Sequence, residues 1–198
     1  MRIIDCVNKG LLVSVVAGLV VTVPARGEVL ASPTDTRGKI MTLQLTSASF
    51  SHQGRIPRLY TCEGKDISPA ISWAGAPAGT KSLALIVDDP DAPDPEHPRT
   101  VWVHWVLYNL PASATGLAEA VKLDALPAGT LEGTNDWGRT GYGGPCPPIG
   151  RHRYFFKLYA IDMVLPDLKK PNKARLESSI KGHVLAQTEL VGTYKKGD

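Results

Sequence analysis

Turn residues divide this chain into short apolar or alternating runs, a pattern that few architectures satisfy. The runs cover residues 41–45, 71–73, 82–88, 101–110 and 154–161. Their lengths are typical of β-strands, and the 19 glycines and 16 prolines in the sequence supply the turns that connect them. The pattern predicts a mainly β fold, an antiparallel β-sandwich in which two sheets pack face to face.

A helical pattern occurs near the C-terminus. It follows Pro171 and the capping residue Asn172, and its apolar residues recur three or four positions apart. These residues are Leu176, Ile180, Val184 and Leu185. The sequence therefore predicts an amphipathic C-terminal helix, and a shorter helical turn near residues 115–121, as the few helices of the β-sandwich.

The first residues have the composition of a secretory signal. Arg2 and Lys9 precede an uncharged apolar run over residues 11–23, which is short for a membrane span, and Pro24 and small residues follow it. We therefore predict that the protein is exported.

The cleavage point is predicted from the small residues beyond the apolar run. Val29 and Ala31 stand at the spacing that a signal peptidase reads, which places the cut before Ser32. A cut near Gly27, an uncleaved membrane anchor, and a true start at Met41 are the alternatives.

The remaining chain fits one globular domain. We expect a signal peptide over residues 1–31, a flexible leader over 32–40 and a single domain over 41–198, located in the periplasm or secreted. The formal net charge of +3 is small, and the basic residues are scattered along the chain. We therefore expect no nucleic-acid partner.

The cysteines predict one disulfide. Cys6 lies in the predicted signal, so the mature chain keeps only Cys62 and Cys146, an even pair for an oxidising compartment. Two buried free thiols are the alternative. Neither cysteine has a partner at zinc-ligand spacing, and we expect no metal and no cofactor.

Common catalytic templates do not occur in the sequence. It has no G-x-S-x-G, H-E-x-x-H, G-x-x-x-x-G-K or G-x-G-x-x-G motif, which removes the usual support for hydrolase and nucleotide-binding functions. The residues that could carry chemistry lie instead where strands meet loops rich in proline and glycine.

An acidic turn follows the run over residues 82–88. Asp88, Asp89, Asp91 and Asp94 emerge together there, separated by prolines. A rigid surface turn, in which the aspartates accept backbone N–H bonds, is the alternative to a functional site.

His104 lies in an alternating strand. The alternation predicts Trp102 and His104 on one face and Val103 and Trp105 on the other. A buried histidine satisfied by one backbone partner is the alternative to a ligand-binding role.

A glycine- and proline-rich loop over residues 141–150 leads into a third group of polar residues. His152 and Tyr154 follow it two positions apart, so both are expected on the same side of their strand. An imidazole beside a phenol offers two donors, which suits an anion.

These motifs, in this order, resemble the phosphatidylethanolamine-binding protein family, in particular its bacterial Raf-kinase-inhibitor-like branch. The matching segments are Asp89-Pro90-Asp91-Ala92-Pro93, Trp102-x-His104, Gly143-Gly144-Pro145-Cys146-Pro147-Pro148 and His152-Arg153-Tyr154. Similarity at residues 66–73 and 181–194 extends the resemblance over most of residues 50–194.

The resemblance implies a β-sandwich with a small cavity that accepts phosphate, acetate or a phospholipid headgroup, and a possible homodimer. The cavity residues that it implies are Asp89, His104, Pro148, His152 and Tyr154, with Trp102, Tyr142 and Gly144 as wall residues. The segment between Pro148 and His152 is shorter than in many relatives, which affects the shape of the rim.

A carboxylate in an anion pocket needs an explanation. We expect Asp89 to accept a hydrogen bond from one histidine nitrogen, which raises the pKa of that imidazole and makes its other nitrogen a donor.

These observations predict a binding or regulatory protein rather than an enzyme. One alternative is an enzyme that uses Asp89 with His104 or His152 as an acid–base pair, or that holds a metal with two histidines and a carboxylate. Another is a protease or kinase inhibitor that acts through its surface.

Overall fold

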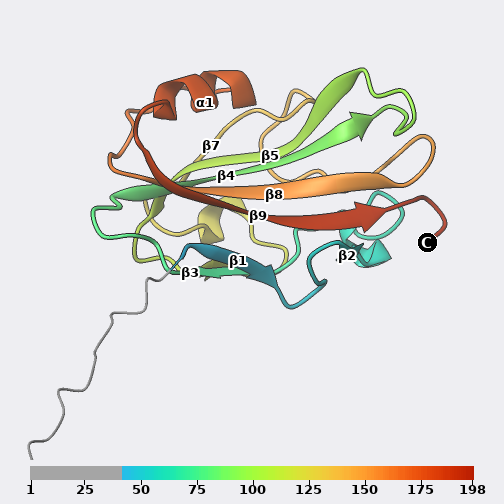
Figure 1. Ribbon diagram of the computed structural model, residues 1–198, viewed down its shortest axis with the longest axis horizontal. Coiled ribbons are helices and arrows are strands. Elements are labelled where there is room, and N and C mark those ends of the chain that lie inside the picture. The colour runs from blue at the N-terminus through green and yellow to red at the C-terminus, as the bar shows by residue number, and fades with distance from the viewer. Residues whose placement is uncertain (1–41) are drawn as a thin grey trace, which may run out of the picture. The chain divides into compact units, whose positions relative to one another are not determined.

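The computed structural model describes residues 42–198 as a mainly β domain with two sheets (Figure 1). The predicted signal peptide and leader lie outside the described residues. The three-stranded sheet has the order β1 (Gln44–Ser47), β3 (Ile71–Ala74), β6 (Gly116–Leu117). The six-stranded sheet has the order β2 (Gly54–Arg55), β9 (Val184–Tyr194), β8 (His152–Ile161), β4 (Ser82–Ala92), β5 (Thr100–Pro111), β7 (Leu131–Glu132). The mainly β prediction is confirmed.

Both faces of the six-stranded sheet are covered, and β4 shows why. Leu83 and Leu85 belong to the apolar cluster that includes the small sheet, whereas Ala84 and Ile86 belong to the cluster that includes α1 (Lys173–Ile180). A strand that is buried on both faces needs apolar residues at every position, which explains the unbroken run in this part of the sequence.

A β-bulge breaks the alternation that the sequence predicts for β5. Val87 pairs with Trp105 and Asp88 pairs with Val103, so His104 is the extra residue. As a result Val103 packs in the cluster on the α1 side and Trp105 in the cluster between the sheets. The prediction that Val103 and Trp105 share a face is wrong, because a bulge changes the side on which every later residue of a strand lies.

The C-terminal helix is shorter than predicted and is not terminal. Asn172 caps α1 by accepting a hydrogen bond from the backbone N–H of Arg175, and the helix ends at Ile180. Val184 and Leu185, which the sequence pattern assigns to the helix, begin β9 instead. β9 pairs with β8 along most of its length, and this pairing outweighs the helical spacing of Val184 and Leu185 in the sequence.

The second predicted helical turn, at residues 115–121, is also wrong. Gly116 and Leu117 form β6, in which Leu117 pairs with Ile71. A Cβ atom on Gly116 would lie 2.5 Å from the carbonyl oxygen of Ile71, so the close strand pairing needs glycine at this position. The other helical segments of the described chain are two 3₁₀ turns, η1 (Arg58–Tyr60) and η2 (Leu123–Ala125).

Within residues 42–198, none of the helices has the length and apolar character needed to span a bilayer.

Candidate functional site

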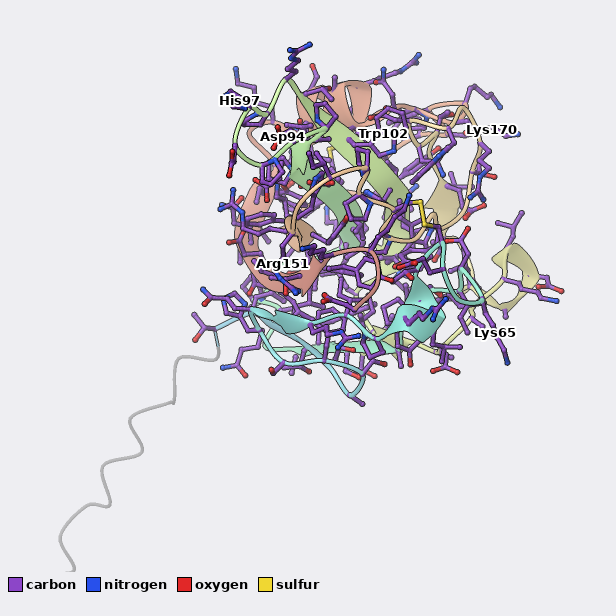
Figure 2. The ribbon with its side chains drawn as sticks, turned by 90° about the vertical axis from the view of Figure 1, so that its right-hand side faces the viewer. Lys65, Asp94, His97, Trp102, Arg151 and Lys170 are labelled. Carbon is purple, nitrogen blue, oxygen red and sulfur yellow. A yellow bond between two sulfur atoms is a disulfide. The ribbon has the colours of Figure 1, made fainter. Side chains whose placement is uncertain are left out.

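A pocket of about 320 Å³ lies where the strands of the larger sheet bring three polar segments together. Because β4 is antiparallel to both β5 and β8, the end of β4 lies beside the starts of β5 and β8. Figure 2 views the molecule from the end where Trp102 lies. The lining residues are Asp89, Ala92, Pro93, Trp102, His104, Trp137, Cys146, Pro147, Pro148 and His152.

Three aspartates of the acidic turn form ion pairs with different roles. Asp88 is fully buried and accepts hydrogen bonds from Lys157, at 2.9 Å, and from Lys173 at the start of α1, at 2.5 Å. Asp91 accepts from the guanidinium of Arg153, which holds the pKa of the Asp91 carboxyl below its usual range. These two aspartates therefore support the sheet and the helix, and Asp89 is the aspartate that lines the pocket.

Asp89 forms a buried pair with His152. Its Oδ2 lies 2.7 Å from His152 Nδ1, and its Oδ1 accepts the backbone N–H of Asp91 at 2.8 Å. Burial raises the pKa of the Asp89 carboxyl, although the hydrogen bond from His152 opposes that shift. The other ring nitrogen, His152 Nε2, lies 2.9 Å from the carbonyl oxygen of Ile149. Both nitrogens of His152 are thus engaged within the protein, and neither is the free donor that the sequence suggests.

His104 has a different environment. Its Nδ1–H donates to the carbonyl oxygen of Gly143 at 2.7 Å, and its Nε2 is buried without a hydrogen-bond partner. Desolvation lowers the pKa of His104 to about 4, although the Gly143 carbonyl opposes this. The ring is therefore neutral at physiological pH, and the histidine that Asp89 was expected to contact is His152 and not His104.

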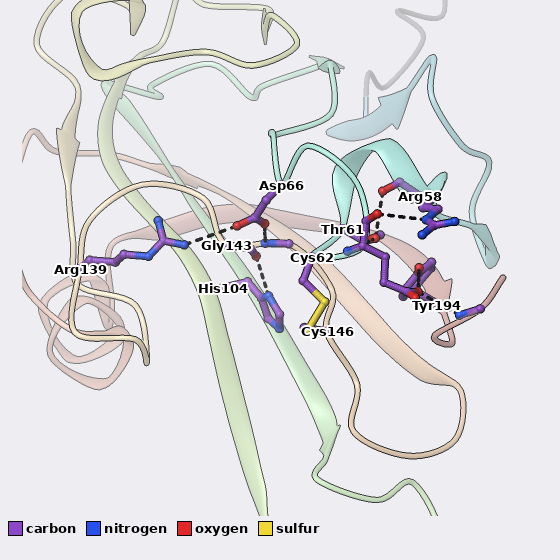
Figure 3. Close-up of a disulfide and its surroundings, with 12 residues drawn as sticks. Arg58, Thr61, Cys62, Asp66, His104, Arg139, Gly143, Cys146 and Tyr194 are labelled. Carbon is purple, nitrogen blue, oxygen red and sulfur yellow. Dashed lines mark hydrogen bonds and ion pairs between the residues drawn. A yellow bond between two sulfur atoms is a disulfide. The ribbon is translucent and has the colours of Figure 1, made fainter.

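The glycine- and proline-rich loop is held by the segment that follows η1 (Figure 3). Cys62 and Cys146 are joined by a disulfide, with their Cα atoms 5.4 Å apart, and the N–H of Cys62 donates to the carbonyl of Pro145. The N–H of Gly144 donates to Asp66 Oδ1 at 2.6 Å. These contacts fix the position of the neighbouring Gly143 carbonyl, which in turn orients His104.

Three residues that the sequence assigns to the site do not line the pocket. The Tyr142 hydroxyl donates to the carbonyl of Tyr60, and a Cβ atom on Gly144 would lie 2.3 Å from that same oxygen. Both residues therefore face the η1 segment. Tyr154 is buried, and its ring packs edge-on against His104 at 5.2 Å between centroids, with its hydroxyl unpartnered. It lies next to His104 rather than on the pocket surface.

Sequence reasoning missed several wall residues, of which Trp137 is the largest. Its ring lies edge-on to His104, at 5.1 Å between centroids, and to Trp102, at 5.5 Å. A Cβ atom on Gly143 would lie 2.4 Å from the Trp137 ring, so the glycine lets the indole approach the loop. No periodic pattern in the sequence marks a tryptophan in a turn. Ala92, Pro93 and Pro147 also line the pocket and were not assigned to its wall from the sequence. Cys146 lines the pocket as well as closing the disulfide.

The fold and the pocket together define a class: a two-sheet, mainly β protein with a small pocket at its strand ends. A model described as phosphatidylethanolamine-binding protein matches residues 46–195. A UPF0098 protein of Methanothermobacter thermautotrophicus is 50% identical over 157 residues, which are 78% of this chain and 100% of that protein. The chain therefore belongs to the phosphatidylethanolamine-binding protein family, which confirms the resemblance found in the sequence.

Solved structures agree with this assignment. A phosphatidylethanolamine-binding protein homologue from Chlamydia trachomatis superimposes with a TM-score of 0.72 at 42% identity, over 79% of this chain and 99% of that one. Escherichia coli YbcL, described as a new member of the mammalian PEBP family, gives 0.70 at 32% identity, over 77% and 98%.

Proposed function

We propose that this chain is a binding protein whose pocket receives a small phosphate-bearing ligand, such as phosphate itself or a phospholipid headgroup. The observation that carries the proposal is the unpartnered Nε2 of His104, a buried polar atom on a residue that lines the pocket. Buried polar atoms without partners are rare in folded proteins, so one at a pocket indicates a position where a ligand completes the hydrogen bond.

The shape of the pocket supports a small ligand. Its volume of about 320 Å³ is at the lower end of the range for ligand sites. Trp102, Trp137, Pro147 and Pro148 form much of the wall, and such side chains lose little conformational entropy when a ligand binds. The ligand class is the one named in the family to which the chain belongs.

The polar groups of the pocket favour binding over catalysis. The acid–base pair that the sequence suggests is not free to react: His152 has both nitrogens engaged with Asp89 and Ile149. His104 has an unpartnered Nε2, but its Nδ1 is paired with the Gly143 carbonyl and not with a carboxylate. Within residues 42–198 no group of three or more His, Cys, Asp or Glu side chains is placed to hold a metal ion. The two-histidine metal site is therefore not favoured by this geometry.

The same proposal includes export to the periplasm or the cell exterior. The disulfide between Cys62 and Cys146 supports it, because such bonds persist in oxidising compartments. The composition of residues 1–31 is the second support. No contact in the described structure points to a protease or kinase as partner.

The experiment is a thermal-shift titration of the mature protein with phosphoethanolamine. Ligand at a hundred times its Kd stabilises a folded protein by about 2.7 kcal/mol, which is readily measured. Trp102→Ala removes a pocket wall and should reduce the shift. Val101→Ala is the matched control, because Val101 is the adjacent residue of β5, is 42% exposed and does not line the pocket. Equal shifts in both variants, or none in the wild type, would contradict the proposed function.

A further inference from the structure

A second pocket, of about 370 Å³, lies nearer the end of β5 and shares no lining residue with the strand-end pocket around His104. Tyr108 of β5 and Leu131 of β7, which pair across the sheet, form its apolar floor. Leu123 of η2 also lines it and is 64% exposed. The pocket therefore offers apolar surface to a small ligand, at a volume within the range of ligand sites.

A buried hydroxyl of this second pocket has no partner. Thr130 lines the pocket and is 9% exposed, and its Oγ1 makes no hydrogen bond to any of the described residues. The backbone of Thr130 is satisfied, because its N–H donates to the carbonyl of Pro127. A buried hydroxyl without a hydrogen bond costs free energy, so this one indicates a position where a ligand supplies the missing bond.

The charged groups of the pocket divide into one internal pair and two unpaired side chains. Lys169 Nζ lies 2.7 Å from Asp167 Oδ2, and these two charges cancel. Glu132 and Lys170 make no ion pair with each other or with any other residue of 42–198. The pocket therefore presents one carboxylate and one ammonium that are both available to a ligand.

Tertiary contacts bring Lys170 to the end of β7, which carries Glu132. Thr134 Oγ1 donates to the carbonyl of Lys170 at 3.0 Å, and the N–H of Thr134 donates to the carbonyl of Pro171 at 2.9 Å. Lys169 and Lys170 have φ angles of 59° and 56°, in the left-handed region that is unfavourable for residues other than glycine. Such a backbone persists where the surrounding structure imposes it, so the fold sets the position of Lys170.

We propose that this second pocket binds a free α-amino acid with an aliphatic side chain. The ligand carboxylate pairs with Lys170, its ammonium pairs with Glu132, and its side chain packs against Leu131 and Tyr108. The hydroxyl of Thr130, which can donate or accept, completes a hydrogen bond to one of the charged groups. Because the four charged side chains of the pocket sum to zero, a zwitterion complements them better than an ion of either sign. The inference goes beyond the proposed function, since it concerns a different pocket.

The test is calorimetric titration of the mature protein with L-leucine and with three analogues that each lack one recognised group. Leucinamide has no carboxylate, 4-methylpentanoate has no ammonium, and glycine has no aliphatic side chain. Each change removes a charge-assisted hydrogen bond or an apolar contact, so each analogue should bind about ten-fold or more weakly than leucine. No saturable binding of leucine at millimolar concentration, or equal affinity for leucine and any one analogue, would overturn the inference.

Two charge variants assign the two ends of the ligand. Lys170→Gln should weaken the binding of leucine about ten-fold to a hundred-fold and leave that of leucinamide, which has no carboxylate, unchanged. Glu132→Gln should weaken leucine by a similar factor and leave 4-methylpentanoate unchanged. Lys65→Gln and Glu96→Gln make the same changes at exposed residues outside the pocket and should bind leucine as the wild type does.

Thr130→Val separates ligand binding from folding. Since the hydroxyl has no partner, its replacement by a methyl group should leave the ligand-free protein as stable as the wild type, or more stable, in urea unfolding. Leucine should nevertheless bind several-fold more weakly to this variant. Lower stability with unchanged binding of leucine would show that the hydroxyl serves the fold, and would contradict its role in the pocket.

The two proposals fail in separate measurements. If Lys170→Gln and Glu132→Gln both bind leucine as the wild type does, leucine lies outside this second pocket and the inference is wrong. The proposed function is tested by phosphoethanolamine in the strand-end pocket, and its failure would leave the binding of leucine unaffected.

Discussion

Asp89 Oδ2 and His152 Nδ1 lie 2.7 Å apart although 63 residues separate them in the chain. The contact forms because β4 and β8 are antiparallel neighbours, so the end of one strand meets the start of the other. It occupies both side chains, so that among the three titratable residues of the pocket only His104 keeps a ring nitrogen without a partner.

The loss of stability on replacing Asp89 should depend on whether the new side chain can keep the hydrogen bonds of the carboxylate. In Asp89→Asn the amide can accept the N–H of Asp91 and donate to His152 Nδ1, while His152 Nε2–H still donates to Ile149, so we expect a loss below about 1.5 kcal/mol. Asp89→Ala leaves buried groups unpaired and should cost about 2–4 kcal/mol. Urea unfolding at pH 7 measures both. Similar losses for the two variants would show that the charge itself matters more than the pairing.

The buried histidine predicts a specific pH dependence of stability. His104 has a pKa of about 4 in the folded protein and 6.5 as its ordinary value. Below pH 6.5 the unfolded chain takes up a proton that the folded chain does not, so stability should fall as pH decreases from 6.5 to 4, by about 3 kcal/mol in total.

The measurement for this prediction is urea unfolding of the wild type and His104→Asn at several pH values between 4 and 7. The variant should lose the part of the pH dependence that comes from His104, whereas His97→Asn, at an exposed histidine, should retain it. Parallel pH curves for wild type and His104→Asn would show that His104 is not held neutral.

The disulfide should make a large contribution to stability. Cys62 and Cys146 are 84 residues apart, and a cross-link that closes a loop of this length stabilises a domain by about 2–5 kcal/mol. The double variant Cys62→Ser/Cys146→Ser should lose about that amount in urea unfolding. Counting of thiols in denatured, unreduced mature protein checks the bond itself, and two reactive thiols would rule it out.

The mature N-terminus should lie between Glu28 and Met41, because the apolar run over residues 11–23 is followed by small residues. Intact-mass measurement on protein from the cell envelope or the medium identifies the first residue. A species that retains residues 11–23 would show that this segment is an anchor and not a cleaved signal.

Local patterns in the sequence were sufficient to predict several strands and the family of this protein. The apolar runs predict the positions of β3, β4, β5 and β8, because strand formation at a buried surface depends on residue type and spacing. The ordered motifs also identify the family. Four of the residues that they assign to the site, Asp89, His104, Pro148 and His152, line one pocket in the structure.

Only the tertiary structure decided the parts that depend on distant contacts. The bulge at His104 and the strand character of Val184 and Leu185 arise from pairing with β4 and β8, which no local period encodes. The protonation of His104 likewise depends on a carbonyl 39 residues away and on burial by Tyr154 and Trp137. The sequence could therefore predict part of the pocket lining, but the rest of the lining, and whether each residue donates or accepts a hydrogen bond, is determined by partners that folding brings to it.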